Sequence, residues 1–268
     1  AGLEHPALDL YRLRFDYTSE DMLSQYLQLR AAFLERFEAL NARQQKTHLL
    51  SLLNDTVQLV KSGLLDIADS LELYRLGLET GALLNKGRLT VNTFTTIVSA
   101  SNTKGDFDFT KYFIENYAAR LDEKVGQDCA TWAWAHTAYW QNDLEACLSI
   151  LLEYNFKTLH FQLIGRVLHT QAYFDLSLRD QSYQLYLFSF FNTFEKWLSR
   201  EKTLSKANKT AFLHFVQTCR KLARYYADAD AGPEKVAQLL EEEPNVQALN
   251  WLRQKQAEIL QIKQAAFR

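Results

Sequence analysis

The sequence predicts an all-α protein, and two observations carry this prediction. No proline occurs between Pro6 and Pro233, and because proline breaks helix interiors, its absence permits long helices. Apolar residues recur at helical spacing, as at Phe109, Phe113 and Tyr117, whereas strand-like alternation is nowhere sustained. We therefore expect about a dozen helices and no sheet.

The front of the chain is expected to cap the fold. Residues 8–15 and 19–40 each follow a helical pattern, so that 1–41 forms an N-terminal capping hairpin. Residues 42–201 then contain four helical hairpins. Gly63 and Gly105 mark helix ends, and Asp106, Asp143 and Asp180 are expected N-caps. The longer connection at 81–89 indicates a loop inserted between two hairpins.

The spacing of the three aspartates indicates a repeat. Asp106, Asp143 and Asp180 follow one another at intervals of 37 residues, and a fixed period of this size is typical of stacked helix hairpins. Each hairpin exposes an apolar face that only a neighbour can cover, so we expect one solenoid over 1–268 rather than separable domains.

The end of the chain, 202–268, is expected to form C-terminal capping helices. A helix capped by Ser205 covers 205–227 and ends before Gly232. Two further helices are expected over 233–242 and 244–262, because Pro233 and Pro244 suit the first turn of a helix.

Several segments together resemble a known family. The segments are 73–84, 86–89, the apolar residues Phe94, Ile97 and Val98, and then 105–109, 113–117 and 250–252. In this order they resemble an uncharacterised bacterial family of helical-repeat proteins similar to tetratricopeptide (TPR) repeats. The resemblance covers most of the chain and implies a right-handed α-solenoid of stacked TPR-like hairpins, without an established activity. Members of that family are longer, so this chain is similar to their C-terminal part.

Composition and cysteine usage exclude several classes of protein. The 268 residues have a formal net charge of −2, which excludes a chain that is polybasic throughout or an acidic disordered tail. Three cysteines without a CxxC pair suit a reducing compartment. The sequence has no apolar run of membrane-spanning length and no visible leader after Ala1, so we expect a cytoplasmic location.

Motifs for catalysis are missing from the sequence. It contains no HExxH, GxSxG, P-loop or GxGxxG pattern, so we expect no enzyme, cofactor or metal. Cys129, His136 and Cys147 could form a nucleophile or metal cluster, but small residues among tryptophans are more typical of a packed core. His160 and His169, nine residues apart, are interpreted as ordinary polar positions.

Two further patterns concern a calcium loop and the aromatic residues. The segment 228–232 resembles the start of a calcium loop, but Pro233 and Leu239 occupy the positions where an EF-hand needs glycine and glutamate. Aromatic residues cluster at 132–140 and 188–197. Trp132, Trp134 and Tyr139 cannot all share one helix face, so at least one ring should meet a neighbouring hairpin or a partner.

A basic stripe is the candidate partner-binding surface. Between Lys196 and Arg224 there are eight lysines and arginines but one acidic residue, and an acidic stretch follows at 228–243. At helical pitch, four of the basic residues fall within about 60° of one another. They are Lys206, Lys209, Arg220 and Arg224. This stripe could face solvent, an acidic protein or nucleic acid.

The architecture favours a non-catalytic scaffold that binds a protein or peptide. The alternative is a nucleic-acid-associated regulator that uses the basic stripe. The partner surface, the partner and the oligomeric state are left open by the sequence.

Overall fold

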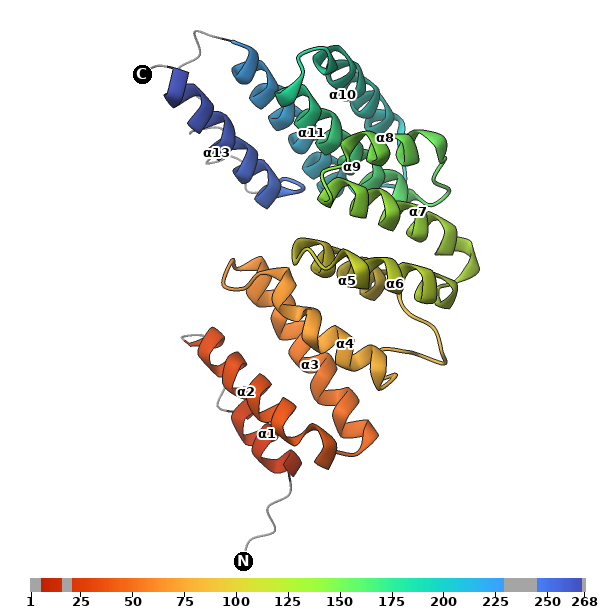
Figure 1. Cartoon of the computed structure of the whole chain (residues 1–268), viewed down its shortest axis with the longest axis vertical. Coiled ribbons are helices and arrows are strands. Elements are labelled where there is room, and N and C mark those ends of the chain that lie inside the picture. Colours follow the sequence, from red (N-terminus) through yellow and green to blue (C-terminus); the bar gives the residue numbers. More distant parts are fainter. Residues whose placement is uncertain (1–5, 16–20, 229–244, 267–268) are drawn as a thin grey trace, which may run out of the picture. The chain divides into compact units, whose positions relative to one another are not determined.

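The computed structural model describes residues 6–15, 21–228 and 245–266. Over these residues the chain forms twelve α-helices and three short 3₁₀-helices and contains no strand (Figure 1). The prediction of an all-α protein is therefore confirmed. The expected helix over 233–242, the calcium-loop segment after Asp228, Gly232 and Pro244 lie outside the described residues.

The chain divides into two compact units, Ala1–Asp143 and Leu144–Arg268, and each is described by itself. The first unit contains the helices of the predicted front cap and of the first hairpins. They are α1 (Pro6–Phe15), α2 (Met22–Arg36), α3 (Ala42–Lys61), α4 (Leu71–Glu79), α5 (Val91–Thr103), α6 (Phe107–Tyr117) and α7 (Glu123–Trp140), with 3₁₀-helices at Phe37–Ala39, Ile67–Ser70 and Ala118–Arg120.

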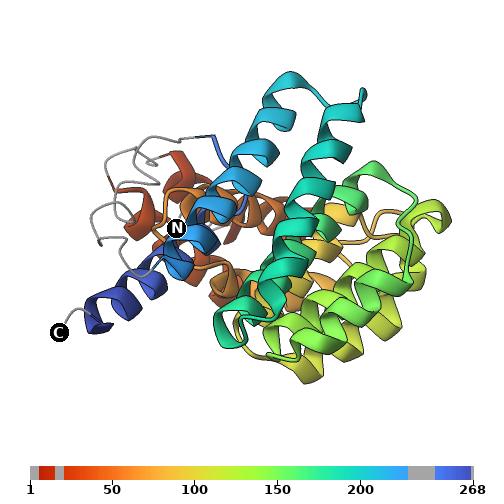
Figure 2. The same cartoon turned by 90° about the horizontal axis from the view of Figure 1, so that it is seen from above.

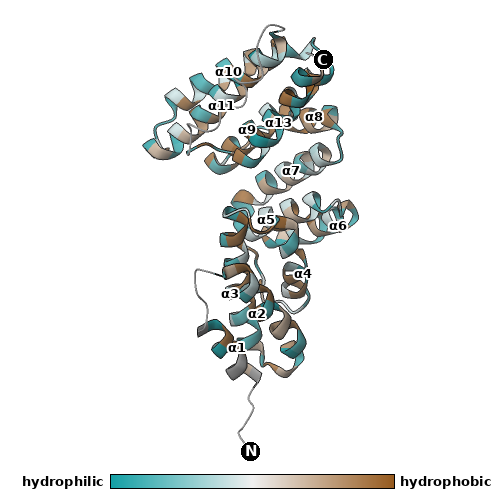
Figure 3. Cartoon of the chain, turned by 90° about the vertical axis from the view of Figure 1, so that its left-hand side faces the viewer, coloured by the Kyte–Doolittle hydropathy of each residue, from teal (hydrophilic) through white to brown (hydrophobic). Residues whose placement is uncertain are grey.

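Helices of the first unit pack on their neighbours in the sequence, and α5 also packs on α7, two helices further on. Individual helices alternate between hydrophilic and hydrophobic residues (Figure 3), as expected of helices with one buried face. The rings of Phe94 on α5 and Phe113 on α6 lie 4.8 Å apart and are fully buried. Apolar contacts of this kind hold the hairpins together.

The helix ends in this unit follow the turn signals in the sequence. Gly63 and Gly105 both have a φ of 75°, the left-handed conformation that glycine adopts without strain. The next residue after Gly105, Asp106, caps α6 by accepting a hydrogen bond from Phe109 N at 3.2 Å. The predicted loop at 81–89 is confirmed, because α4 ends at Glu79 and α5 begins at Val91.

The second unit contains five α-helices among its described residues. They are α8 (Leu144–Glu153), α9 (Leu159–Arg179), α10 (Tyr183–Arg200), α11 (Lys206–Ala227) and α13 (Leu249–Ala266). Helices α10 and α11 lie side by side (teal and blue in Figure 2), and α9 packs on α8, α10 and α11. The buried side chains between them include Phe191, Phe194 and Phe215.

Two predicted helix starts in this unit are wrong. Asp180 does not cap α10, which begins at Tyr183; its carboxylate accepts a hydrogen bond from Ser182 N at 2.8 Å and forms a tight turn. The last helix begins at Leu249 rather than at 244. The preceding segment instead bonds to α11, because Gln247 N donates to Ala211 O at 3.3 Å. Ser205 caps α11 as predicted.

Candidate functional site

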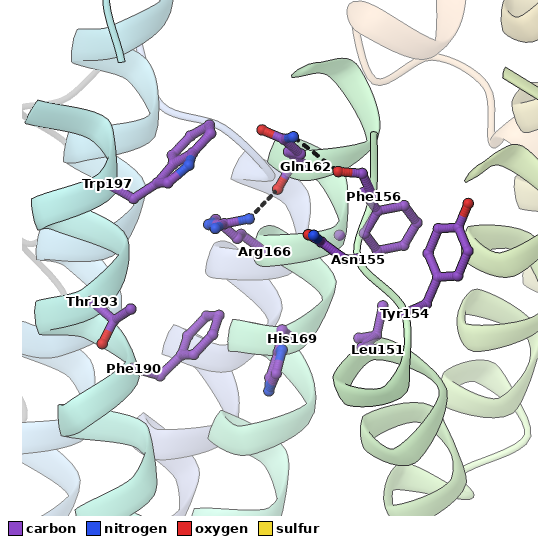
Figure 4. Close-up of a pocket in the computed structure, with 11 residues that line it drawn as sticks. Leu151, Tyr154, Asn155, Phe156, Gln162, Arg166, His169, Phe190, Thr193 and Trp197 are labelled. Carbon is purple, nitrogen blue, oxygen red and sulfur yellow. Dashed lines mark hydrogen bonds between the residues drawn. The ribbon is translucent and has the colours of Figure 1, made fainter. Parts of the chain in front are cut away.

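A cavity of about 280 Å³ lies in the second unit, between α9, α10 and the segment that joins α8 to α9. Figure 4 shows the side chains around it. Its wall is rich in aromatic rings and contains two basic side chains. The lining residues are Leu151, Tyr154, Asn155, Phe156, Gln162, Gly165, Arg166, His169, Phe190, Thr193 and Trp197.

Helical periodicity places these residues on two facing helix surfaces. On α9, Gln162, Arg166 and His169 are spaced by four and three residues, so they follow one side of the helix. On α10, Phe190 and Trp197 are seven residues apart, about two turns. Because α9 and α10 pack together, the two rows border the same space (Figure 4).

Gly165 shapes the wall that the connecting segment contributes. A Cβ atom at Gly165 would lie 2.8 Å from Cε2 of Phe156, so only glycine lets the Phe156 ring pack against α9. The carbonyl oxygen of Phe156 accepts a hydrogen bond from Gln162 Nε2 at 2.9 Å. The segment after α8 is therefore fixed to α9 at two points.

Arg166 brings a positive charge into this cavity. Its guanidinium carbon lies 4.4 Å from the centre of the Trp197 ring, and Nη1 donates to Gln162 O at 3.2 Å. Within the residues that the structure describes, no carboxylate pairs with Arg166. Burial lowers its pKa, but a guanidinium keeps its proton. Arg166 therefore retains unused N–H donors.

His169 lies one turn further along α9. Its ring stacks on Phe190, with ring centres 4.2 Å apart and planes 25° apart, and its Nε2 is buried without a hydrogen-bond partner. Burial, and next the charge of Arg166, lower the pKa of His169 to about 4. The imidazole is therefore neutral at pH 7.

These groups are suited to binding an anion that carries an apolar body. A planar carboxylate matches the fork of an arginine, and the rings of Trp197 and Phe190 offer flat apolar surfaces beside it. The lining contains no carboxylate, lysine or thiol. The one charged group in the lining of this cavity is therefore the positive guanidinium of Arg166.

Sequence reasoning missed Arg166 and interpreted His169 as an ordinary polar position, whereas the structure buries it. A signal was present, because Arg166 is the one charged residue between Lys157 and Asp175. A lone charge within a long uncharged stretch of a helix predicts either a buried partner or a site. The aromatic cluster at 188–197, which is visible in the sequence, supplies Phe190 and Trp197 to the cavity.

The cysteines lie in core positions. Cys129 is on α7 and Cys147 on α8, and both are buried free thiols, as is Cys219 on α11. Burial, and then the charge of Asp128, raise the pKa of Cys129 to about 12. Burial likewise raises the pKa of Cys219, so the thiols of Cys129 and Cys219 are protonated at pH 7. No three histidine, cysteine or acidic side chains in 6–15, 21–228 and 245–266 are grouped to hold a metal ion.

His136 joins two helices of the first unit. Its Nδ1 lies 2.9 Å from Asn102 Nδ2 on α5, and its Nε2 accepts a hydrogen bond from Trp140 Nε1 at 3.2 Å. Burial lowers its pKa to about 3. The neighbouring rings point in different directions, as predicted, because Trp132 is buried whereas Trp134 is partly exposed.

All four members of the basic stripe lie on α11. Arg220 donates to Glu195 Oε2 at 2.6 Å, and Lys209 donates to a backbone carbonyl of α10 at 3.4 Å. Lys206 and Arg224 are exposed. They are eighteen residues apart on α11, which is about 27 Å along the helix. The role of this stripe in partner binding stays a prediction.

Comparison with known proteins adds no relative. No family model, curated protein or solved structure matches the chain. In the part of the chain that the structure describes, no helix combines the length and the apolar composition needed to cross a membrane.

Proposed function

We propose that the chain is a non-catalytic binding module for a protein or peptide, and that the cavity between α9 and α10 receives an acidic side chain of this partner. The observation that carries the proposal is Arg166, a partly buried guanidinium without a carboxylate among the described residues. Charge-assisted hydrogen bonds to such a group contribute about 1.5–3 kcal/mol.

We also propose a right-handed solenoid of TPR-like hairpins as the scaffold, in keeping with the family resemblance. In each unit one helix packs on the helix two positions further on, α5 on α7 and α9 on α11, as well as on its neighbours. Packing of this kind is expected when each hairpin stacks on the next. The alternative of a nucleic-acid regulator has less support, because Arg220 is already paired with Glu195.

The cavity is tested directly with phenylacetate, which combines a carboxylate with one aromatic ring. In an NMR titration of the labelled chain, we expect phenylacetate to shift the Trp197 indole and Arg166 side-chain resonances. Benzyl alcohol, which lacks the charge, should bind at least tenfold more weakly. Equal binding of the two probes would contradict a role for the guanidinium.

The partner class is tested by selecting peptides from a display library on the full chain. We expect the selected peptides to contain an acidic residue next to an apolar one, and to bind the Arg166→Gln variant at least tenfold more weakly, about 1.4 kcal/mol. Arg43→Gln, a change at an exposed arginine of the first unit, is the matched control. Peptides that bind both variants equally would contradict the proposal.

A further inference from the structure

A second cavity in the same unit is lined by acidic rather than basic side chains. It measures about 570 Å³ and lies between α8, the end of α9 and the start of α10. Three tyrosines and two acidic residues line it. They are Tyr173, Tyr183, Tyr186, Glu145 and Asp180. None of these five residues lines the Arg166 cavity.

The tyrosines form a cluster that is open to solvent. The rings of Tyr173 and Tyr186 lie 6.2 Å apart with planes at 12°, and those of Tyr183 and Tyr186 also lie 6.2 Å apart. Tyr186 is 60% exposed, which is unusual for so large a ring. The electron-rich faces of tyrosine rings attract cations.

Two carboxylates, those of Glu145 and Asp180, lie beside this cluster. Neither Asp180 nor Glu145 forms an ion pair with any residue that the structure describes. Asp180 uses Oδ1 to accept from Ser182 N at 2.8 Å. The Ser182 side chain also hydrogen-bonds to this carboxylate, and the two bonds together fix the exposed carboxylate at the edge of the cavity.

We infer that this cavity binds a basic side chain of the partner protein, arginine in preference to lysine. A guanidinium stacks on tyrosine faces and donates N–H groups to carboxylates at the same time. The exposed side chain of Leu152 lines the same cavity and offers apolar surface to the methylene stem. The identity of the partner as a protein rests on the proposed function, but the charge class of this cavity does not.

The probe for this cavity is Nα-acetyl-arginine methylamide, and its neutral isostere, the citrulline compound, is the matched ligand control. We titrate each into the full chain with labelled tyrosines and follow the ring resonances of Tyr173, Tyr183 and Tyr186. We expect the arginine compound to shift them and to bind at least tenfold more tightly than the citrulline compound, with weaker binding at high salt. Equal binding of the two compounds would overturn the inference.

Variants assign the binding to this cavity. We expect Tyr186→Leu and Asp180→Asn each to weaken binding of the arginine compound fivefold or more. Tyr112→Leu, which changes an exposed tyrosine of α6, should leave it unchanged. The side chains of Tyr186 and Asp180 are both exposed, so circular dichroism should show an intact fold in these two variants. Unchanged binding in both variants would overturn the inference.

The Arg166→Gln variant separates the two proposals. It should lose phenylacetate binding and keep binding of the arginine compound. If this variant no longer bound the arginine compound, the compound would bind at the Arg166 cavity and not at the tyrosine-lined one. That result would overturn the inference. If phenylacetate did not bind to the chain but the arginine compound did, only the proposed function would be contradicted.

Discussion

At the scale of single residues, two helical glycines illustrate how surroundings decide the effect of one methyl group. Gly77 on α4 faces the core, where a Cβ atom would lie 2.6 Å from Leu83 Cγ and 2.8 Å from Leu49 Cδ2. Gly126 on α7 is different, because its nearest neighbour would be Ala118 O at 3.5 Å, an ordinary contact. The same residue type is required at one position and dispensable at the other.

We predict opposite effects of alanine at these two positions. Gly77→Ala should lower the free energy of unfolding by about 1–3 kcal/mol, because Leu83 and Leu49 must move. Gly126→Ala should raise it by about 0.5–1 kcal/mol, because alanine restricts the unfolded chain and favours the helix. Urea unfolding of both variants measures the difference. A stabilising Gly77→Ala would contradict the close packing described for α4.

The candidate site could be predicted from the sequence only in part. The aromatic cluster on α10 was visible because aromatic side chains are rare and large. Arg166 and His169 were not recognised, because their importance depends on what is missing around them in space. A sequence pattern shows which residues are neighbours along a helix, but it does not show that no carboxylate approaches from another helix.

At the scale of elements, α13 is attached to the second unit by apolar contacts and one buried ion pair. Trp251 packs edge-on against Phe174 with ring centres 5.4 Å apart. Lys255 Nζ lies 2.7 Å from Asp175 Oδ1, and both residues are buried. Burial by itself lowers the pKa of Lys255, but Asp175 and Glu258 raise it by more, so the lysine is charged.

We predict that breaking this pair loosens α13. Lys255→Met should cost about 3–5 kcal/mol because it removes the positive charge that faces the buried carboxylate of Asp175, whereas Lys255→Met combined with Asp175→Leu should recover most of the loss. Hydrogen exchange of α13 amides measures the effect, with the exposed Lys206→Met as control. If the double variant were as unstable as the single one, the ion pair would not be the cause.

Helix ends were predictable where the backbone itself needs a special residue. Gly63 and Gly105 end helices in the left-handed conformation, which few other residues adopt. Asp180 was wrongly predicted as a cap, because aspartate also suits the tight turn that it forms with Ser182. The start of α13 was missed because the segment before it bonds to α11, a contact between distant parts of the sequence.

At the scale of the whole molecule, the all-α class follows from composition and periodicity, because both are properties of the entire chain. How the helices of the two units stack depends instead on the shapes of many side chains, which no local pattern specifies. The proposed binding function would use two small cavities, whose residues come from α8, α9, α10 and the segments that join them.

Buried histidines in both units should make stability depend on pH. The pKa of His136 is lowered to about 3 and that of His169 to about 4, whereas both titrate near 6.5 when the chain is unfolded. Between these values the unfolded chain binds more protons. Their contribution to stability is therefore complete above pH 6.5 and decreases as the pH falls towards 4.

We predict that the free energy of unfolding decreases by about 1.4 kcal/mol per pH unit for each of these histidines below pH 6. Urea unfolding at pH 7.0, 6.0 and 5.5 measures the slope, in a range where most carboxylates stay ionised. His169→Gln should reduce the slope by about one proton. A flat profile would show that these histidines are protonated in the folded state.

The three buried thiols also make the opening of the chain measurable without any label. Cys129 lies in the first unit, and Cys147 and Cys219 lie in the second. Because each thiol is shielded, iodoacetamide should modify it only when the surrounding helices separate. Mass spectrometry of the alkylated peptides then gives one opening rate for each cysteine.

If the hairpins form one continuous array, the three cysteines should be alkylated at a common rate in mild urea. A distinct rate for Cys129 would show that the two units open independently and would contradict a single cooperative solenoid. The alkylation rates of these core cysteines thus show whether opening of one unit is coupled to opening of the other.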